Sequence, residues 1–272
     1  MDHSSNDFPD GNHRDFPSGP RGVALVTGAS HRVGRAIARE LARHGLGVLL
    51  TYRTRSDECH ETARLAIADA RAAGHAVTAA VRQLDLEDAA AVARFAESVR
   101  AGCAGGALDC IVHNASAYEP TPIDTLAAAQ VESMHRIEVV SPLVLTHALR
   151  AELARSRLDG GGAVVFFSDI HALGRARPGF TAYLLAKAAV QTLAQQLAVE
   201  LAPKVRVHCV APGVIMWPEG FPDDTRQAIL ARTPLGRAGT PEEAAKLVRF
   251  LVLEASYMTG ETIAIDGGRS LR

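Results

Sequence analysis

The stretch Val23-Ala24-Leu25-Val26-Thr27-Gly28-Ala29-Ser30-His31-Arg32-Val33-Gly34 decides the fold of this chain. An apolar strand runs into a glycine-bearing turn, and the amphipathic segment 35–44 continues as a helix. Gly28 permits the tight turn, and Gly34 lets the helix lie close to the strand. The free amides at the start of that helix can then bind a pyrophosphate. The stretch therefore predicts the first strand, turn and helix of a nucleotide-binding α/β sheet.

The rest of the chain alternates apolar strands with helical patterns, without a repeat or a long linker. The predicted strands are residues 23–27, 48–52, 76–83, 108–113, 163–168, 205–210 and 262–265; the predicted helices are residues 32–44, 57–73, 86–101, 126–155, 181–201, 223–231 and 241–253. Continuously apolar strands separated by helices indicate a parallel sheet covered on both faces. Right-handed crossovers then give a single-domain, Rossmann-like α/β fold, a doubly wound sheet of about seven strands with its ligand crevice at their carboxyl ends.

Composition narrows the class of protein. The chain has 272 residues, of which 47% are hydrophobic, and this is enough for one large core; we assign it to residues 21–272. Residues 1–20 are polar and rich in glycine and proline, and we expect them to form a disordered tail. A formal net charge of −1 gives no electrostatic reason to expect nucleic acid or an anionic membrane as a partner.

Cysteine spacing and hydropathy point to the cytoplasm. The four cysteines are widely spaced and form neither a disulfide pattern nor a metal motif. No apolar run reaches the length of a membrane span, and the N-terminus lacks a secretory apolar segment. We therefore expect a cytoplasmic protein without a metal.

Tyr183 and Lys187 are the pair of residues that suggests acid–base catalysis. One helical turn separates them, so both side chains project from the same helix face. A nearby ammonium favours the phenolate, and we expect it to lower the tyrosine pKa from its usual value of about 10. Such pairs also occur on helix surfaces without a function. Together with the nucleotide-binding turn, the pair predicts proton transfer near neutral pH.

The residues after the second strand predict which nicotinamide cofactor binds. The segment Thr51-Tyr52-Arg53-Thr54-Arg55-Ser56 holds no acid that would bind a ribose 2′-hydroxyl. Arg53 and Arg55 can bind a 2′-phosphate, with Thr54 as a hydroxyl donor, whereas Ser56 either joins them or caps the next helix. We predict NADPH; the alternative is a solvated basic turn.

Residues 21–272 resemble the short-chain dehydrogenase/reductase family. Further motifs add to the turn and the Tyr/Lys pair: Asp85-Leu86, Asn114-Ala115-Ser116, Pro212-Gly213 and Asp266-Gly267-Gly268. Within the family, the chain is most similar to reductases of pterins (pteridine and dihydromonapterin reductases). That narrower likeness lies in Thr27-Gly28 with Arg32, in the stretches 114–118 and 266–272, and in Asp169. Relatives are commonly homotetramers packed through the helices that match residues 126–155 and 181–201.

The resemblance implies a catalytic set of Asp169, Tyr183 and Lys187. Asp169 matches the position of the family's usual serine, as in pteridine reductases. The loop before Tyr183 is one residue longer than usual, so Ser168 remains an alternative, and Asp169 can instead cap its own loop. Glu138 occupies the place of the family's helix asparagine. It can pair with Lys187, receive a water, or reflect a shift in register.

The resemblance also implies the binding residues. The implied cofactor contacts are Gly28, Ser30, His31, Arg32, Val33, Gly34, Arg53, Thr54, Arg55, Asp85, Leu86, Asn114, Ala115, Ser116, Tyr183, Lys187, Pro212, Gly213 and Ile215. The implied substrate contacts are Arg32, Ser116, Tyr118, Asp169, Tyr183 and Trp217. Tyr118 would stack on a pterin ring, or else cover its own loop. Asp85 would contact the adenine, or else have no role beyond the N-cap of the next helix. Trp217 lies in a lid segment and either closes over the ring or anchors that segment.

The expected activity is NADPH-dependent reduction of a dihydropterin, a small molecule, to its tetrahydro form. Dihydromonapterin or dihydrobiopterin is favoured, and dihydrofolate is a weaker substrate. Tyr183, with Asp169, would protonate the ring nitrogen. Two alternatives stay open: a reductase of ketones such as 3-oxoacyl thioesters, and a non-catalytic sensor that binds NADPH.

Overall fold

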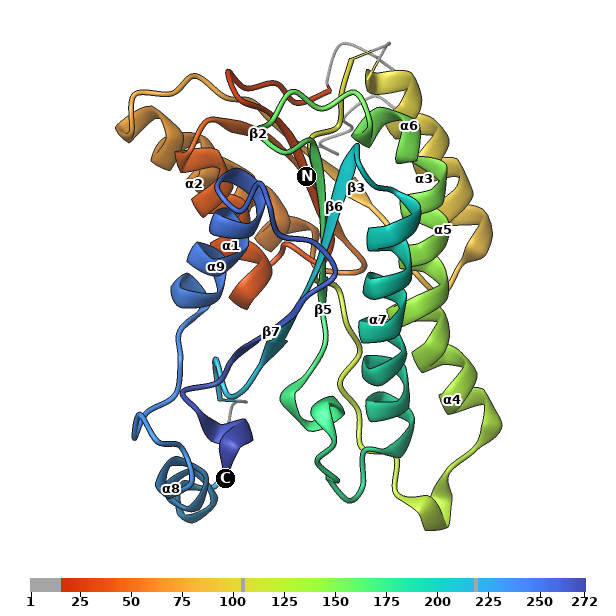
Figure 1. The fold of residues 1–272 in the computed structure, drawn as a ribbon, viewed down its shortest axis with the longest axis vertical. Coiled ribbons are helices and arrows are strands. Elements are labelled where there is room, and N and C mark those ends of the chain that lie inside the picture. Colours follow the sequence, from red (N-terminus) through yellow and green to blue (C-terminus); the bar gives the residue numbers. More distant parts are fainter. Residues whose placement is uncertain (1–15, 104–105, 218–219) are drawn as a thin grey trace, which may run out of the picture.

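A seven-stranded parallel sheet forms the centre of the protein (Figure 1). The computed structural model describes residues 16–103, 106–217 and 220–272. The strands lie in the order β3-β2-β1-β4-β5-β6-β7. Their bounds are Gly22–Val26 (β1), Leu46–Tyr52 (β2), Ala79–Gln83 (β3), Cys110–His113 (β4), Gly162–Phe167 (β5), Val205–Pro212 (β6) and Thr262–Ile265 (β7). The chain reverses its winding direction between β1 and β4, which confirms the doubly wound fold.

Helices cover both faces of the sheet. The bounds of the α-helices are Arg32–Arg43 (α1), Ser56–Ala72 (α2), Ala89–Cys103 (α3), Ala128–His135 (α4), Ser141–Ala148 (α5), Arg150–Leu153 (α6), Thr181–Glu200 (α7), Asp223–Ala231 (α8) and Pro241–Leu253 (α9). In Figure 1, α1, α2 and α9 lie on one face, and α3, α5 and α7 lie on the other. Helix α8 and the C-terminus lie together near one end of the molecule, on the side of α9.

The strands are apolar throughout because both of their faces are buried. In β1, Ala24 and Val26 pack into the core beneath α1 and α9, whereas Val23 and Leu25 face the core beneath α3 and α5. Alternate side chains of a strand point to opposite faces, so each layer needs its own set of apolar residues. This double burial explains why the sequence shows continuous apolar runs rather than alternation.

The predicted helix 126–155 is four shorter elements in the structure. Helix α4 passes into a π-helical turn, Arg136–Val140, before α5 and α6 continue. A π-turn holds one more residue than an α-turn, and such turns often occur at functional sites. Here the wider turn lies around the buried side chain of Glu138.

Two other predicted boundaries shift by three residues each. Helix α3 begins at Ala89, three residues later than predicted, because the carboxylate of Asp88 accepts hydrogen bonds from the amides of Ala90 and Ala91. Strand β3 begins at Ala79, also three residues late. The carboxyl end of β3, which lies at the edge of the sheet near the site, is Gln83, as predicted.

Residues 16–20 are attached to the domain, although the sequence assigned them to the tail. Phe16 packs against the core beneath α3. The backbone of Ser18 exchanges hydrogen bonds with Thr78, at 2.7 and 2.8 Å. The remainder of the expected disordered tail, residues 1–15, lies outside the described residues.

Other structural expectations concern cysteines, metals and the membrane. All four cysteines are free and buried. Across the described ranges, no group of histidine, cysteine and carboxylate side chains is arranged to hold a metal ion. None of the helices in those ranges is long and apolar enough to span a bilayer.

Candidate active site

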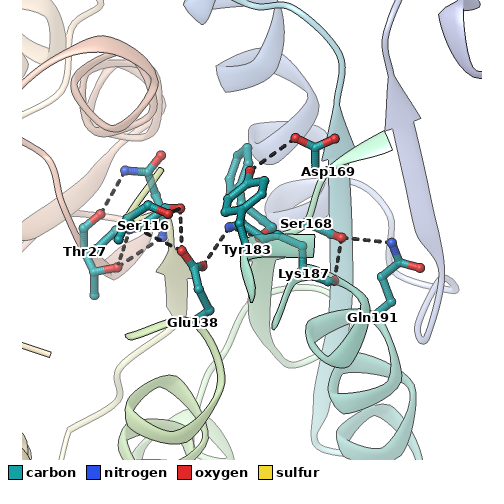
Figure 2. A network of polar contacts seen from close by, with 12 residues as sticks. Thr27, Ser116, Glu138, Ser168, Asp169, Tyr183, Lys187 and Gln191 are labelled. Carbon is teal, nitrogen blue, oxygen red and sulfur yellow. Dashed lines mark hydrogen bonds and ion pairs between the residues drawn. The ribbon is translucent and has the colours of Figure 1, made fainter. Parts of the chain in front are cut away.

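The chemistry-bearing residues meet at the carboxyl ends of the central strands. Strand β5 ends at Phe167, so Ser168 and Asp169 leave the sheet at its edge. Helix α7 begins at Thr181 and carries Tyr183 and Lys187 one turn apart, both buried. Figure 2 shows their side chains with Asp169 and Glu138 as one network of polar contacts. Parallel strands bring all of these segments to one edge, the usual ligand crevice of such sheets.

Asp169 lies between the tyrosine and a histidine. The Tyr183 hydroxyl donates to Oδ2 of Asp169 at 3.2 Å (Figure 2). The backbone amide of His171 donates to Oδ1 at 2.8 Å, and Nδ1 of the same residue lies 2.8 Å from that oxygen. Asp169 therefore faces Tyr183 and also caps its own loop, the short 3₁₀ helix Ile170–Leu173.

Ser168 points the other way. Its hydroxyl donates to the backbone oxygen of Lys187 at 2.8 Å and accepts from the side chain of Gln191 at 2.9 Å. Both contacts fasten the end of β5 to α7. Of the two candidates for the serine position, the structure places Asp169 against the tyrosine.

Lys187 and Glu138 form a buried ion pair. Nζ of Lys187 donates to Oε2 of Glu138 at 2.7 Å and to the backbone oxygen of Phe167 at 2.8 Å. Each charged side chain is only 3% exposed. The second carboxylate oxygen of Glu138 accepts from the hydroxyl of Ser116 at 2.5 Å and from the amide of Ala117 at 3.1 Å. Among the three alternatives for Glu138, pairing with Lys187 is the one observed.

The expected low pKa of Tyr183 is wrong. Burial raises the tyrosine pKa well above 10, and the charges of Asp169 and Glu138 raise it further. Nζ of Lys187 lies 5.6 Å from the centre of the tyrosine ring, but its charge is balanced by the Glu138 carboxylate. The buried tyrosine therefore keeps its proton, which is the protonation state that a general acid requires.

Asp169 is a carboxylate in this arrangement. Burial by itself would raise its pKa, but hydrogen bonds from the side chain and backbone of His171 outweigh that effect and hold the pKa below its ordinary value. The site thus combines a neutral phenol with an adjacent anion, which accepts the phenol's hydrogen bond.

Two aromatic rings and a guanidinium lie beside the phenol of Tyr183. Tyr118 stacks on Phe180 with ring centres 4.9 Å apart and meets Tyr183 edge-on at 5.1 Å. The guanidinium of Arg177 lies 4.2 Å from the centre of the Phe180 ring. Tyr118 remains 46% exposed, so a flat ligand can reach its free surface.

Sequence reasoning missed Phe180, Arg177 and His171. His171 is two residues from Asp169, but nothing in that spacing predicts that the two side chains meet. Phe180 and Arg177 belong to a loop whose conformation the sequence pattern does not predict. For Phe180, a usable signal is its position directly before Thr181, where helix α7 begins.

Arg32 spans the crevice to the expected lid. Its Nε lies 3.3 Å from Sδ of Met216, and its Nη2 donates to the backbone oxygen of Trp217 at 3.3 Å. Trp217 also packs on Phe221, with ring centres 5.2 Å apart. Arg32 adopts a left-handed backbone conformation (φ 52°), which turns the chain into α1. Residues 218 and 219 of this segment lie outside the described residues.

The turn after β1 fits a dinucleotide. A Cβ on Gly34 would lie 2.3 Å from the carbonyl oxygen of Gly28, so only glycine allows the helix this close. Asn114 ties the turn to β4, because its side-chain amide donates to the carbonyls of Thr27 and Gly28 at 3.0 Å each. His31, the N-cap residue of α1, makes no side-chain hydrogen bond to the helix, so the first amides can bind an anionic ligand.

The predicted cofactor residues form a continuous track across the edge of the sheet. Gly28, Ser30, His31, Arg32, Val33 and Gly34 follow β1; Arg53, Thr54 and Arg55 follow β2; Asp85 and Leu86 follow β3; Asn114, Ala115 and Ser116 follow β4; Pro212 ends β6 and Gly213 and Ile215 follow it; Tyr183 and Lys187 lie on α7. Each group belongs to a neighbouring strand or helix, so the structure brings the whole predicted set together at one edge.

Individual members of this track have other contacts. Arg53 and Arg55 are exposed and lie 3.8 and 3.4 Å from Glu87 and Glu58. Surface pairs of this kind are weak, so both guanidiniums can bind a phosphate instead. Asp85 accepts from the amide of Glu87 at 2.9 Å, four residues before α3 begins. It therefore does not cap that helix.

Comparison with known proteins agrees with this architecture. Residues 28–270 match the family model described as enoyl-(acyl carrier protein) reductase. A dihydromonapterin reductase of Klebsiella pneumoniae is 32% identical over 253 residues, covering 93% of this chain and 98% of the relative. A cis-4-hydroxycyclohexanecarboxylate dehydrogenase of Sinomonas cyclohexanicum is 36% identical over 253 residues, covering 90% and 95%. The structure of a short-chain dehydrogenase/reductase from Mycobacterium ulcerans superposes with a TM-score of 0.82 at 28% identity, covering 94% and 91%.

The doubly wound sheet, its glycine turn and the buried Tyr/Lys pair define a Rossmann-type oxidoreductase that binds a nicotinamide cofactor. The match over most of the chain places it in one family of such enzymes. This protein belongs to the short-chain dehydrogenase/reductase family, and it resembles dihydromonapterin reductases.

Proposed function

We propose that this oxidoreductase reduces a dihydropterin, dihydromonapterin or dihydrobiopterin, to its tetrahydro form with NADPH. One observation carries the proposal: the Tyr183 hydroxyl is hydrogen-bonded to a carboxylate, Asp169, where the family usually has serine. Reducing a C=N bond requires a proton on nitrogen, and a phenol beside a carboxylate is suited to donate one. The similarity to dihydromonapterin reductases supports the same choice of substrate.

NADPH supplies the hydride when it is bound. Tyr183, kept neutral by its surroundings, donates a proton to the substrate nitrogen. Asp169 orients the hydroxyl through their hydrogen bond and is itself held by His171. Lys187 lies beside the tyrosine ring and faces the nicotinamide ribose in this proposal, with Glu138 fixing its ammonium. Tyr118 presents a half-exposed ring on which a flat substrate can stack.

The preference for NADPH over NADH is part of the proposal. Arg53 and Arg55 flank the end of β2, where a ribose 2′-phosphate would lie, and neither has a strong carboxylate partner there. Arginine binds phosphate through two parallel hydrogen bonds, which a free 2′-hydroxyl cannot replace.

An assay of NADPH oxidation tests the function. Purified protein is given dihydromonapterin, dihydrobiopterin, dihydrofolate and a panel of ketones that includes a 3-oxoacyl thioester. We expect both dihydropterins to be reduced and the ketones to give much lower kcat/KM. Reduction of ketones alone would contradict the proposal and favour the second candidate, a carbonyl reductase, which the 36% identical hydroxy-acid dehydrogenase supports.

Tyr183→Phe is the variant for the same assay. General acid catalysis is typically worth about 10²- to 10⁴-fold in rate, so kcat should fall by a factor in that range. The affinity for NADPH, measured by fluorescence titration, should change little because the aromatic ring and Lys187 remain. Binding without any turnover in the wild-type protein would instead identify a sensor.

We also propose that the protein is a homotetramer assembled through α4, α5 and α7. Four apolar side chains there are more than a third exposed: Leu143 and Val144 on α5, Leu185 on α7, and Val140 in the π-helical turn between α4 and α5. Light scattering on the eluting protein gives the mass of the assembly. A monomer mass would contradict this part of the proposal.

A further inference from the structure

A cavity beside the proposed catalytic aspartate is lined by positive charge. Its volume is about 320 Å³, and its wall includes His171, the residue that bonds to Asp169. The remaining wall is dominated by four arginines, Arg175, Arg232, Arg269 and Arg272. The cavity is therefore separated from the proposed proton donor by one carboxylate and one imidazole.

Three separate segments deliver these arginines. Arg175 lies in the loop between β5 and α7, and Arg232 follows directly after α8. Arg269 and Arg272 come from the end of the chain, which Asp266 turns inward by accepting from the amides of Gly268 and Ser270 at 2.9 and 2.6 Å. Figure 1 shows α8 and this terminal segment near one another below the sheet. Because three distant parts of the sequence supply these arginines, the fold itself brings them together.

Within the ranges that the structure describes, none of the four guanidiniums forms a hydrogen bond or an ion pair. Elsewhere the chain pairs its arginines: Arg39 binds Asp69 at 2.7 Å, and Arg237 binds Glu243 at 2.6 Å. Around the cavity, burial lowers the pKa of Arg269 and the neighbouring charge of Arg177 lowers it further, with Asp169 opposing. Like charges brought together in this way repel one another unless an anion joins them.

We propose that the cavity binds an anionic group, a carboxylate or a phosphate, carried by the side chain of the substrate. This inference rests on the proposed function, and it extends the substrate class from the neutral dihydropterins to dihydropterins with an acidic tail. The ring would lie against Tyr118 and Tyr183, and the tail would pass His171 to reach the arginines. Guanidinium groups suit carboxylates and phosphates because they offer two parallel donors to two oxygens.

Kinetics with matched substrates tests the proposal. The double variant Arg232→Gln/Arg272→Gln removes the two exposed charges of the cavity and leaves Asp169 and Tyr183 intact. Dihydrofolate carries two carboxylates, dihydroneopterin monophosphate carries a phosphate, and dihydromonapterin carries neither. We expect the ratio of kcat/KM for either acidic substrate to that for dihydromonapterin to fall at least tenfold, through KM. Unchanged ratios would overturn the proposal.

The comparison between the acidic substrates distinguishes the two kinds of anion. A larger loss for the phosphate compound identifies a phosphate site, and a larger loss for dihydrofolate identifies a carboxylate site. Arg100→Gln is the matched control, since Arg100 is exposed near the end of α3, the helix that leads to the amino end of β4. We expect this control to leave all the ratios unchanged.

A binding measurement keeps this inference separate from the proposed function. Inorganic phosphate is titrated calorimetrically into wild-type protein saturated with NADP⁺, which fills the dinucleotide's own phosphate sites and supplies no hydride to dihydrofolate. We expect binding that weakens at least tenfold in the double variant and that dihydrofolate displaces. Equal binding by both proteins, or binding that dihydrofolate leaves unaffected, would overturn the substrate-tail site. If no pterin were reduced, the proposed function would fail while this titration still reported on the anion site.

Discussion

Tyr183 keeps its proton because its surroundings disfavour another negative charge. The hydroxyl is buried, donates to the Asp169 carboxylate and lies near Glu138, and all three influences raise its pKa. The nearby Lys187 is already paired with the Glu138 carboxylate. A one-turn Tyr/Lys spacing thus does not by itself produce a phenolate. The carboxylates around the pair determine its protonation.

Replacing Asp169 tests this account directly. In Asp169→Asn the tyrosine loses an anionic neighbour, so its pKa should fall. Activity that needs the neutral phenol is lost as pH rises through that pKa. The alkaline limb of the kcat profile should therefore move to lower pH in the variant. A limb at the wild-type position would show that Asp169 does not influence the proton donor.

Arg53 should decide the cofactor preference. Arg53→Asp puts an acid where the 2′-phosphate is proposed to bind, and it can accept from a 2′-hydroxyl instead. Losing one charge-assisted contact is worth about 1.5–3 kcal/mol, so the ratio of kcat/KM for NADPH to that for NADH should fall tenfold or more. Arg100→Asp, on α3, is the control for a charge change elsewhere. A wild-type protein that uses both cofactors equally would already refute the preference.

The π-helical turn between α4 and α5 fixes the lysine. By inserting an extra residue, it places Glu138 in the interior, where one carboxylate oxygen binds Lys187 and the other binds Ser116 and Ala117. The turn thereby joins the loop after β4 to helix α7. A regular helix over the same residues would change which side chain faces Lys187.

A double-mutant cycle over Glu138 and Lys187 measures that connection. Removing one partner leaves the other charge buried, and such changes cost about 3–5 kcal/mol. The double change Glu138→Met/Lys187→Met should cost much less than the sum of the two single changes in urea unfolding. The exposed pair Glu61 and Arg64 on α2 serves as the comparison and should show far weaker coupling. Additive single costs would contradict a buried ion pair.

Among the residues that the structure describes, two histidines outside the site are buried. His208 lies inside the sheet on β6, and neither of its ring nitrogens has a partner in the described part of the protein. Burial lowers its pKa to about 4, with Arg206 adding to the effect. His113 on β4 stacks on Phe166, and burial lowers its pKa to about 3. Both pKa values lie below the usual 6.5, so the folded protein holds these residues neutral.

Acid should therefore destabilise the fold. Below pH 6.5 these histidines bind protons in the unfolded chain but not in the folded protein. The free energy of unfolding therefore decreases as the pH is lowered from 6.5 to about 4. Within that pH window, each histidine lowers the free energy of unfolding by up to about 1.4 kcal/mol for each pH unit of acidification. Above pH 6.5 this loss is absent. His208→Leu should flatten the decline, as measured by urea unfolding between pH 7 and 4. Parallel curves for variant and wild type would contradict this assignment.

Much of this architecture is readable from the sequence because local patterns dictate it. The continuous apolar run of β1 followed by Gly28 and Gly34 requires a buried strand, a tight turn and a close helix, and the structure shows all three. The long helix 126–155 was misjudged because periodicity reports an apolar face but not where the winding changes. The start of α3 was misjudged because two acids, Asp85 and Asp88, can each cap a helix.

The order of strands and helices, the glycine turn and the spacing of Tyr183 and Lys187 were determined by the sequence alone, because each depends on contacts between residues close in the chain. The tertiary structure decided what surrounds that pair. Glu138 lies 49 residues from Lys187, and Arg269 lies about a hundred residues beyond Asp169. Electrostatic energy depends on distance in space, so neither the charge state of the tyrosine nor the arginine-lined cavity can be inferred from positions along the chain.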